Sequence, residues 1–175
     1  MDVINQRRSI RKYKKQEVSK EMITTIIDAA ILAPSWKNSQ TARYHVVMSA
    51  DLLTKVKQEC LPEFNYQNSL DAPVLIITSF IKNRSGYNRD GAANNELENG
   101  WGIYDLGLAN ENLLLKATEL GLGTLVMGIR DADKIRKLLD IDENEIIVSV
   151  IAVGYPDIKP EKPKRKTVTD ITKFY

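Results

Sequence analysis

The chain has 175 residues, 43% of them hydrophobic, and a formal net charge of +2. Its single histidine, His45, and single cysteine, Cys60, are too few for a zinc site or an internal disulfide, and no acidic loop has the spacing of a calcium site. We therefore expect no bound metal. Because any dyad or triad that uses histidine would have to use His45, we expect a cofactor to carry the reaction if the chain is an enzyme.

The length predicts one domain over residues 1–175, and a folded monomer of this mass buries roughly 70% of its surface. No run of about 20 apolar residues predicts a membrane helix, and the first residues lack the apolar core of a signal peptide. With one cysteine, these features favour a cytoplasmic protein in a reducing compartment, without a membrane partner. We expect no nucleic-acid partner, because the basic residues do not form a groove or helix face with interleaved aromatics.

Hydrophobic periodicity and turn residues predict the elements in chain order. Helices are expected over residues 2–8, 20–32, 50–59, 101–120 and 131–139, and strands over residues 44–48, 73–81, 124–127 and 146–153. Asp2, Ser19 and Asp131 are candidate N-caps of the first, second and fifth helices. Pro34 ends the second helix, and Gly121 is a candidate C-cap of the fourth.

Two long segments lack any such periodicity. Residues 82–100 are polar and rich in Asn and Gly, which predicts a long loop of the kind that is often functional or mobile. The tail over residues 156–175 contains Pro160 and Pro163 and is expected to be extended. Strands interleaved with helices predict an α+β or α/β domain, with a mixed central sheet flanked by helices.

The small net charge results from two basic ends and an acidic region between them. Residues 1–15 carry a net charge of +5 and residues 156–175 a net charge of +3, so the residues between them carry −6. Two solvated basic ends would be an ordinary explanation. The alternative hypothesis is that both ends converge on one anion.

Four segments could carry chemistry, and each also has an ordinary structural explanation. Arg7 to Arg11 could grip a phosphate or be a solvated basic end. The amides and hydroxyls of residues 33–40 could read a planar heterocycle or simply connect a helix to a strand. The glycines of residues 119–128 could let the backbone approach a ligand, or they could be a helix C-cap and a packing position; the helix-to-strand order excludes a dinucleotide fingerprint. The basic residues of 163–166 could complete a phosphate site or belong to a basic tail.

Taken in order, these segments resemble the nitroreductase family of FMN-dependent, homodimeric oxidoreductases. The resemblance covers nearly the whole chain and rests on segments at 7–11, 33–35, 38–40, 70–74, 104–107, 112–117, 121–124 and 165–166. It implies an α+β fold of two interlocked protomers, an extended C-terminal tail, and two FMN sites at their interface.

The resemblance also implies the residues that contact the cofactor. The family segment that holds the phosphate, ribityl chain and pyrimidine side of FMN is matched by Arg7, Arg8, Ser9 and Arg11. Of these, Arg11 matches the position whose cation lies near flavin N1 and O2. Arg165 matches a phosphate-binding cation near the C-terminus, assisted by Lys166 or Lys164.

Other matches lie around the flavin ring. The segment contributed by the partner subunit matches Pro34, Ser35 and Trp36, with Asn38 close behind. Asn65 matches an amide that contacts the pyrimidine, and Asn68 is the alternative. The strand end along the isoalloxazine matches Val126, Met127 and Gly128, where the backbone N–H of Gly128 faces N5.

The implied reaction is ping-pong transfer of hydride from NADH or NADPH, through flavin N5, to a nitroaromatic, quinone or similar electron-poor acceptor. A cation beside N1 would stabilise the negative charge of the reduced ring. The alternatives are another reductase, dehydrogenase or dehalogenase branch of the same fold, or a flavin-binding protein without turnover. We expect no catalytic side chain, and His45 is expected to be a packing or sheet-edge residue.

Four positions depart from the family pattern. Trp36 and Lys37 stand where smaller residues are common, Thr41 where proline often follows glutamine, and Ile129 where a second glycine is frequent. These departures affect the expected shape of the pocket rather than the existence of the FMN site.

Overall fold

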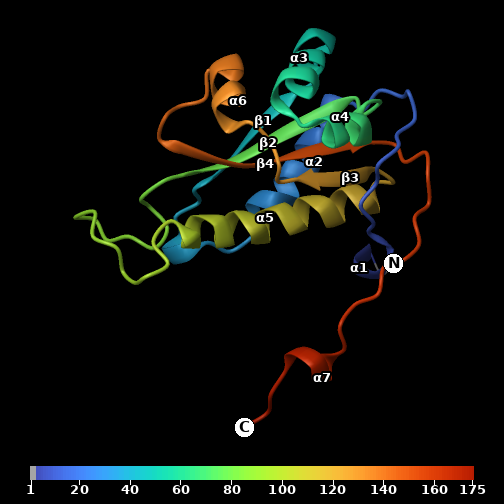
Figure 1. Ribbon diagram of the computed structural model, residues 1–175. Helices are drawn as coiled ribbons and strands as arrows, with labels where there is room; N and C mark the ends of the chain where they lie inside the picture. Colours follow the sequence, from blue (N-terminus) through green and yellow to red (C-terminus); the bar gives the residue numbers. More distant parts are fainter. Residues whose placement is uncertain (1–2) are drawn as a thin grey trace.

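The computed structural model describes residues 3–175, and its centre is one four-stranded sheet (Figure 1). The strands are β1 (Ala42–Val47), β2 (Val74–Ile81), β3 (Gly123–Met127) and β4 (Glu145–Gly154), in the order β1-β2-β4-β3. The expectation of a mixed sheet is wrong for these strands, because all three pairings are antiparallel. The helical connections between strands return the chain in the opposite direction. Within residues 3–175, the one parallel contact with a strand is the isolated bridge between Ser9 and Thr124.

The helices occupy both faces of this sheet. Their bounds are α1 Val3–Gln6, α2 Lys20–Ile31, the 3-10 turn η1 Trp36–Asn38, α3 Ala50–Cys60, α4 Glu63–Ser69, α5 Gly100–Glu119, α6 Ala132–Leu139 and α7 Val168–Ile171. The helices and strands expected from the sequence are confirmed to within a few residues at each end. The turn η1 and the helices α4 and α7 were not expected, and they have few apolar residues at helical spacing.

Local signals at the helix ends are confirmed where the structure describes them. Ser19 Oγ accepts a hydrogen bond from the Met22 N–H at 3.2 Å, and Asp131 Oδ1 accepts one from the Lys134 N–H at 3.0 Å. Gly121, just after α5, has a φ of 78°, a left-handed conformation that glycine adopts without strain. The proposed cap Asp2 lies outside the described residues.

The core forms two layers that share the central strands. Val74 and Ile76 face α2 and α5, whereas Leu75 and Ile77 face α3 and α6 (Figure 1). All four side chains are fully buried, so the expectation that this strand is covered on both faces is confirmed. The residues after Tyr155 first run along the N-terminal segment, and the chain then projects away from the body to α7 and the C-terminus (Figure 1).

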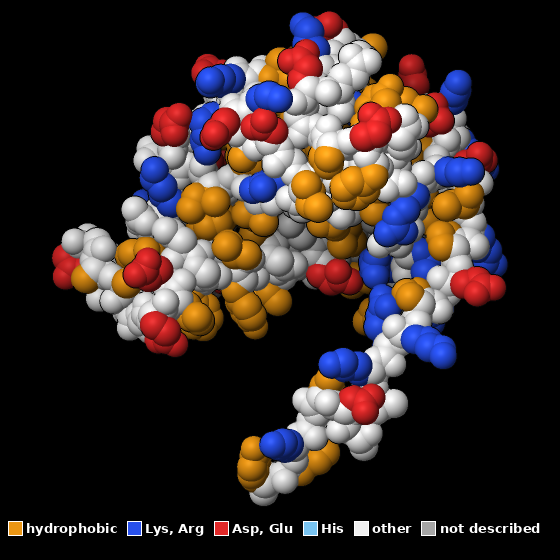
Figure 2. All heavy atoms as spheres, in the orientation of Figure 1, with side chains coloured by type: hydrophobic (Ala, Val, Ile, Leu, Met, Phe, Trp, Pro, Cys, Tyr) orange, Lys and Arg blue, Asp and Glu red, His pale blue; other side chains and the backbone are white. Residues whose placement is uncertain are grey.

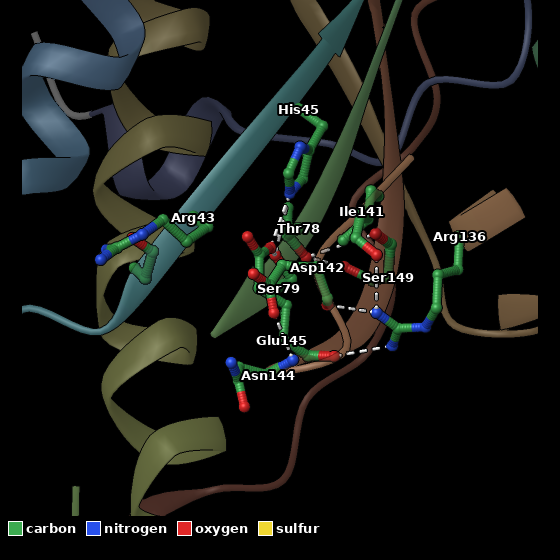
Figure 3. Close-up of polar contacts among 11 residues, drawn as sticks. Arg43, His45, Thr78, Ser79, Arg136, Ile141, Asp142, Asn144, Glu145 and Ser149 are labelled. Carbon is green, nitrogen blue, oxygen red and sulfur yellow. Dashed lines mark hydrogen bonds and ion pairs between the residues drawn. The ribbon is translucent and has the colours of Figure 1, made fainter. Parts of the chain in front are cut away.

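A polar cluster ties the edge strand β1 to the start of β4 (Figure 3). His45 Nε2 lies 2.6 Å from Glu145 Oε2, and the same carboxylate oxygen accepts a hydrogen bond from Ser79 Oγ. Because the histidine contacts the serine and the carboxylate through the same nitrogen, it does not relay a proton between them. His45 is thus a sheet-edge residue, as expected.

None of the helices in residues 3–175 combines the length and the apolar character that crossing a membrane requires.

Candidate functional site

The N-terminal segment lies along the start of β3. The Ile10 N–H donates to the Thr124 carbonyl at 2.9 Å, and Tyr13 Oη donates to the Ile10 carbonyl at 2.8 Å. A Cβ placed on Gly123 would lie 2.6 Å from the Ile10 side chain, so only glycine allows this close approach. These contacts fix the backbone that carries the arginines at positions 7, 8 and 11.

The C-terminal tail runs back past the same segment. The Lys14 N–H donates to the Tyr155 carbonyl and the Asp157 N–H to the Lys12 carbonyl, at 2.9 and 3.0 Å. Farther along, Lys162 Nζ donates to Asn5 Oδ1 at 2.6 Å. The two basic ends of the chain are therefore held side by side.

These two segments enclose a cavity of about 250 Å³, here called the arginine pocket. Its lining residues are Arg7, Arg8, Ser9, Arg11, Pro160, Glu161, Pro163 and Arg165. Five of the residues expected to contact the phosphate, ribityl chain or pyrimidine side of FMN thus meet in one cavity. Lys164 and Lys166 are not among the lining residues; both are exposed on the tail next to Arg165.

The positive charge of the arginine pocket is poorly compensated. The four guanidinium groups face one lining carboxylate, that of Glu161, and Arg7 Nε lies 3.8 Å from Glu111 Oε1. Arg8 Nη1 donates only to backbone carbonyls, and the buried Arg8 Nε has no hydrogen-bond partner within residues 3–175. Planar cations with open donors are suited to a phosphate, which can accept several of these hydrogen bonds at once.

The far end of β3 carries the residues expected along the flavin ring. The side chain of Val126 is 47% exposed and Gly128 is exposed, whereas Met127 is buried in the core, so it offers a ligand only its backbone. Asn65, on α4, is buried and its Nδ2 donates to the Ile129 carbonyl at 2.8 Å. Asn68 lies on the same helix and is half-buried.

A buried lysine that the sequence analysis missed secures α4. Lys57 Nζ donates to the carbonyls of Leu70 and Ala72, at 2.9 and 2.8 Å, where α4 leads into β2. Burial lowers the pKa of this amine, because the charged form is desolvated. A lysine inside an amphipathic helix is usually a surface residue, so no sequence signal marked it.

The segment at Pro34–Asn38 is anchored by a buried carboxylate on α5. The Trp36 N–H donates to Asp105 Oδ2 at 2.9 Å, and Ser85 Oγ donates to the same oxygen at 2.7 Å. Asp105 is only 6% exposed, and it joins this segment to the loop at 82–100. The Trp36 ring also packs on Trp101, with 4.6 Å between ring centroids.

The backbone of this segment has an unusual conformation. Lys37, Asn38 and Gln40 have φ values of 47°, 55° and 49°, in the left-handed region that residues other than glycine seldom occupy. Ser35 Oγ holds the turn by accepting a hydrogen bond from the Gln40 N–H at 3.0 Å. Such conformations cluster at ligand sites, where the surrounding structure stabilises them.

The helix α1, which precedes the arginine pocket in the chain, and the turn η1, which contains Trp36, lie at opposite ends of α5 (Figure 1). Asp105 holds Trp36 near the start of the helix, whereas Gly123 and Ile10 lie beyond its last residue, Glu119. At 1.5 Å per residue, the part of the helix between Asp105 and Glu119 is about 21 Å long. One chain therefore does not bring all the expected site residues together.

Comparisons with known proteins identify relatives across the chain. A family model described as "Nitroreductase family" matches residues 4–155. A Methanothermobacter thermautotrophicus protein assigned as an NADH dehydrogenase/NAD(P)H nitroreductase is 34% identical over 168 residues, which span 91% of this chain and 78% of that protein.

Solved structures share the fold. A nitroreductase family protein of Clostridium difficile aligns with a TM-score of 0.79 and 25% identity, over 98% of this chain and 95% of that one. A structure described as an oxidoreductase containing FMN aligns with a TM-score of 0.76 and 27% identity, over 89% of this chain and 76% of that one. The expected α+β fold is confirmed by these likenesses.

The role of Asp105 can be tested by removing its carboxylate. We expect Asp105→Ala to lower the free energy of unfolding by about 2–4 kcal/mol, because the buried donors of Trp36 and Ser85 lose their acceptor. The emission of the native protein should also shift, since both tryptophans of the chain lie in this cluster. Urea denaturation followed by fluorescence measures both effects. Asp133→Ala, at an exposed position on α6, is the matched control, and a variant that behaves like this control would contradict the role.

Proposed function

Since the chain belongs to the nitroreductase family, we propose that it is an FMN-dependent oxidoreductase that transfers hydride from NADH or NADPH to an electron-poor acceptor. Nitroaromatics and quinones are the acceptor class, and the order of reaction is ping-pong. The observation that carries the proposal is the arginine pocket, where cations from both ends of the chain gather with little compensating negative charge.

The pocket suits the phosphate of FMN in size and in donor chemistry. Arg7, Arg8 and Arg165 would grip the phosphate, and Ser9 would add a hydroxyl donor. The unpartnered Arg8 Nε supports this assignment, because a buried donor without an acceptor is costly and a phosphate oxygen could supply one. Lys166 and Lys164 would contribute only long-range attraction, since neither lines the pocket.

The remaining residues would hold and polarise the ring. The Arg11 guanidinium would stabilise negative charge at the N1 and O2 edge, and the backbone N–H of Gly128 would face N5. Asn65 would contact the pyrimidine through its carbonyl oxygen or its second amide N–H, because its first amide N–H already donates to the Ile129 carbonyl. When bound, FMN would supply hydride transfer, a chemistry that no amino-acid side chain provides.

The proposed enzyme is a homodimer in which each site uses both chains. Pro34, Ser35, Trp36 and Asn38 would reach the cofactor of the partner, because the length of α5 separates them from the arginine pocket of their own chain. The tail supports this assembly: Ile171 is 70% and Phe174 88% exposed, and the tail projects away from the body (Figure 2). Apolar side chains on an extended arm favour burial against a second copy.

Flavin spectroscopy tests the proposed reaction. The purified protein should be yellow, and NADH or NADPH should bleach its flavin band in the absence of oxygen, after which a nitroaromatic should restore the band. Initial rates with both substrates varied should give parallel double-reciprocal lines, as ping-pong requires. A colourless protein that takes up no added FMN would contradict the proposal. Yellow protein that neither nicotinamide reduces would instead be a flavin-binding protein without turnover.

The assembly makes a separate prediction about mass. Light scattering should give twice the chain mass of 19.8 kDa. Combining Ile171→Asp with Phe174→Asp should weaken the dimer by about tenfold or more, because buried apolar anchors dominate interfaces. Gln58→Asp, at an exposed position on α3, adds one negative charge away from the tail as a control. A wild-type monomer that still binds FMN tightly would refute the shared site.

A further inference from the structure

A second cavity opens directly beside the arginine pocket. It has a volume of about 450 Å³ and lies between α1, the end of α5 and the first residues of the tail. Arg8 and Pro160 line both cavities, so the two are neighbours that share a wall. Nothing in the proposed FMN site uses this larger space.

The shared wall carries positive charge. Arg8 contributes its guanidinium, and Lys159 adds an exposed ammonium. Within the described part of the chain, no aspartate or glutamate lines this second cavity. The cations therefore favour an anionic group close to the arginine pocket.

Farther from this wall the lining becomes apolar. Ile10 and Leu122 are buried side chains of the body, and Ile158 of the tail lies 37% exposed on the same cavity. At the end of α5 the Thr118 hydroxyl offers a polar contact, and the helix C-terminus there disfavours negative charge. The cavity thus suits a ligand with a phosphate at one end and a flat, neutral, hydrogen-bonding ring at the other. The volume of the cavity lies in the range of small-molecule sites.

We propose that this cavity binds an adenylate. The choice of adenylate rests on the proposed function, because NADH, NADPH and FAD all contain this group, whereas FMN does not. Its phosphate would contact Arg8 and Lys159, and its adenine would lie between Ile10, Leu122 and Ile158. Because the arginine pocket adjoins the cavity, the adenylate could belong to FAD, whose two phosphates are bonded together, or to the nicotinamide donor.

Calorimetry with AMP tests the cavity directly. The probe is AMP, titrated into protein saturated with FMN, so that the arginine pocket is already filled. We expect one AMP per chain. Ile158→Trp, which fills the cavity, should weaken AMP binding by about tenfold or more, and Lys159→Ala by about three- to tenfold.

Two variants serve as controls. Ile158→Ala alters the same position but leaves the cavity open, and Lys137→Ala removes an exposed cation from α6. Lys137→Ala should bind AMP within about twofold of the wild type, whereas Ile158→Ala, which removes one adenine contact without filling the cavity, should weaken binding less than Ile158→Trp does. Absence of AMP binding to the FMN-saturated protein, or equal binding by Ile158→Trp, would overturn the proposal.

Two further measurements identify the source of the adenylate. If it comes from FAD, excess FAD should replace bound FMN in the wild type and fail to do so in Ile158→Trp. If it comes from the donor, Ile158→Trp should raise the KM for NADH or NADPH and leave unchanged the KM for reduced nicotinamide mononucleotide, which has no adenylate. The flavin absorbance of the same samples tests the proposed function separately. A protein that takes up no flavin would contradict the proposed function, whether or not it binds AMP.

Discussion

The mutual repulsion of four guanidinium groups in one small pocket is the constraint around which this protein is organised. Two unit charges 4 Å apart repel by about 1 kcal/mol in water and by about 4 kcal/mol near a protein surface. The chain nevertheless fixes Arg7, Arg8 and Arg11 through the contacts of Ile10 with β3, and it brings Arg165 back through the pairing of the two termini. Such an arrangement is favourable when an anion with several acceptor oxygens occupies the centre. The phosphate of FMN would satisfy this requirement for Arg7, Arg8 and Arg165, and the same positive field would attract the phosphate of an adenylate in the adjoining cavity.

The length of α5 sets the second constraint. The helix separates the arginine pocket from the strained turn at Lys37–Gln40, and Asp105 fixes that turn through the backbone of Trp36. If both segments serve one cofactor, they must come from different chains. Dimerisation would then be a condition for a complete site rather than an additional property of the enzyme. The exposed apolar residues of the tail are consistent with this, because they have little to contact on their own chain.

Short-range signals in the sequence predicted much of the fold, and long-range contacts account for what they missed. Ser19 and Asp131 cap helices because each bonds a backbone amide three residues away, which a sequence pattern can encode. Helix α4 was missed because its buried residues Asn65 and Ser69 are polar, so its inward face has no apolar period. The direction of the strands was missed because interleaved helices can also join antiparallel neighbours.

The candidate site, like the fold, was predicted from the sequence only in part. The basic ends and the order of the motifs indicated the arginine pocket, and the structure brings those arginines together. Asp105 was missed because a single acidic residue in a helix resembles a surface residue, and its partners Trp36 and Ser85 are 69 and 20 positions away. Lys57 was missed for the same reason. The second cavity was also invisible in the sequence, because it forms only where α1, α5 and the tail meet.

Comparison of FMN with riboflavin tests the central claim most directly, because the two ligands differ only by the phosphate. The dissociation constants of both should be measured by fluorescence at low and high salt. FMN should bind at least about 100-fold more tightly, and the difference should shrink as salt screens the arginines. Arg165→Ala should reduce the difference by weakening FMN alone. Equal affinities for FMN and riboflavin would contradict the account, because the arginine pocket would then not be the phosphate site.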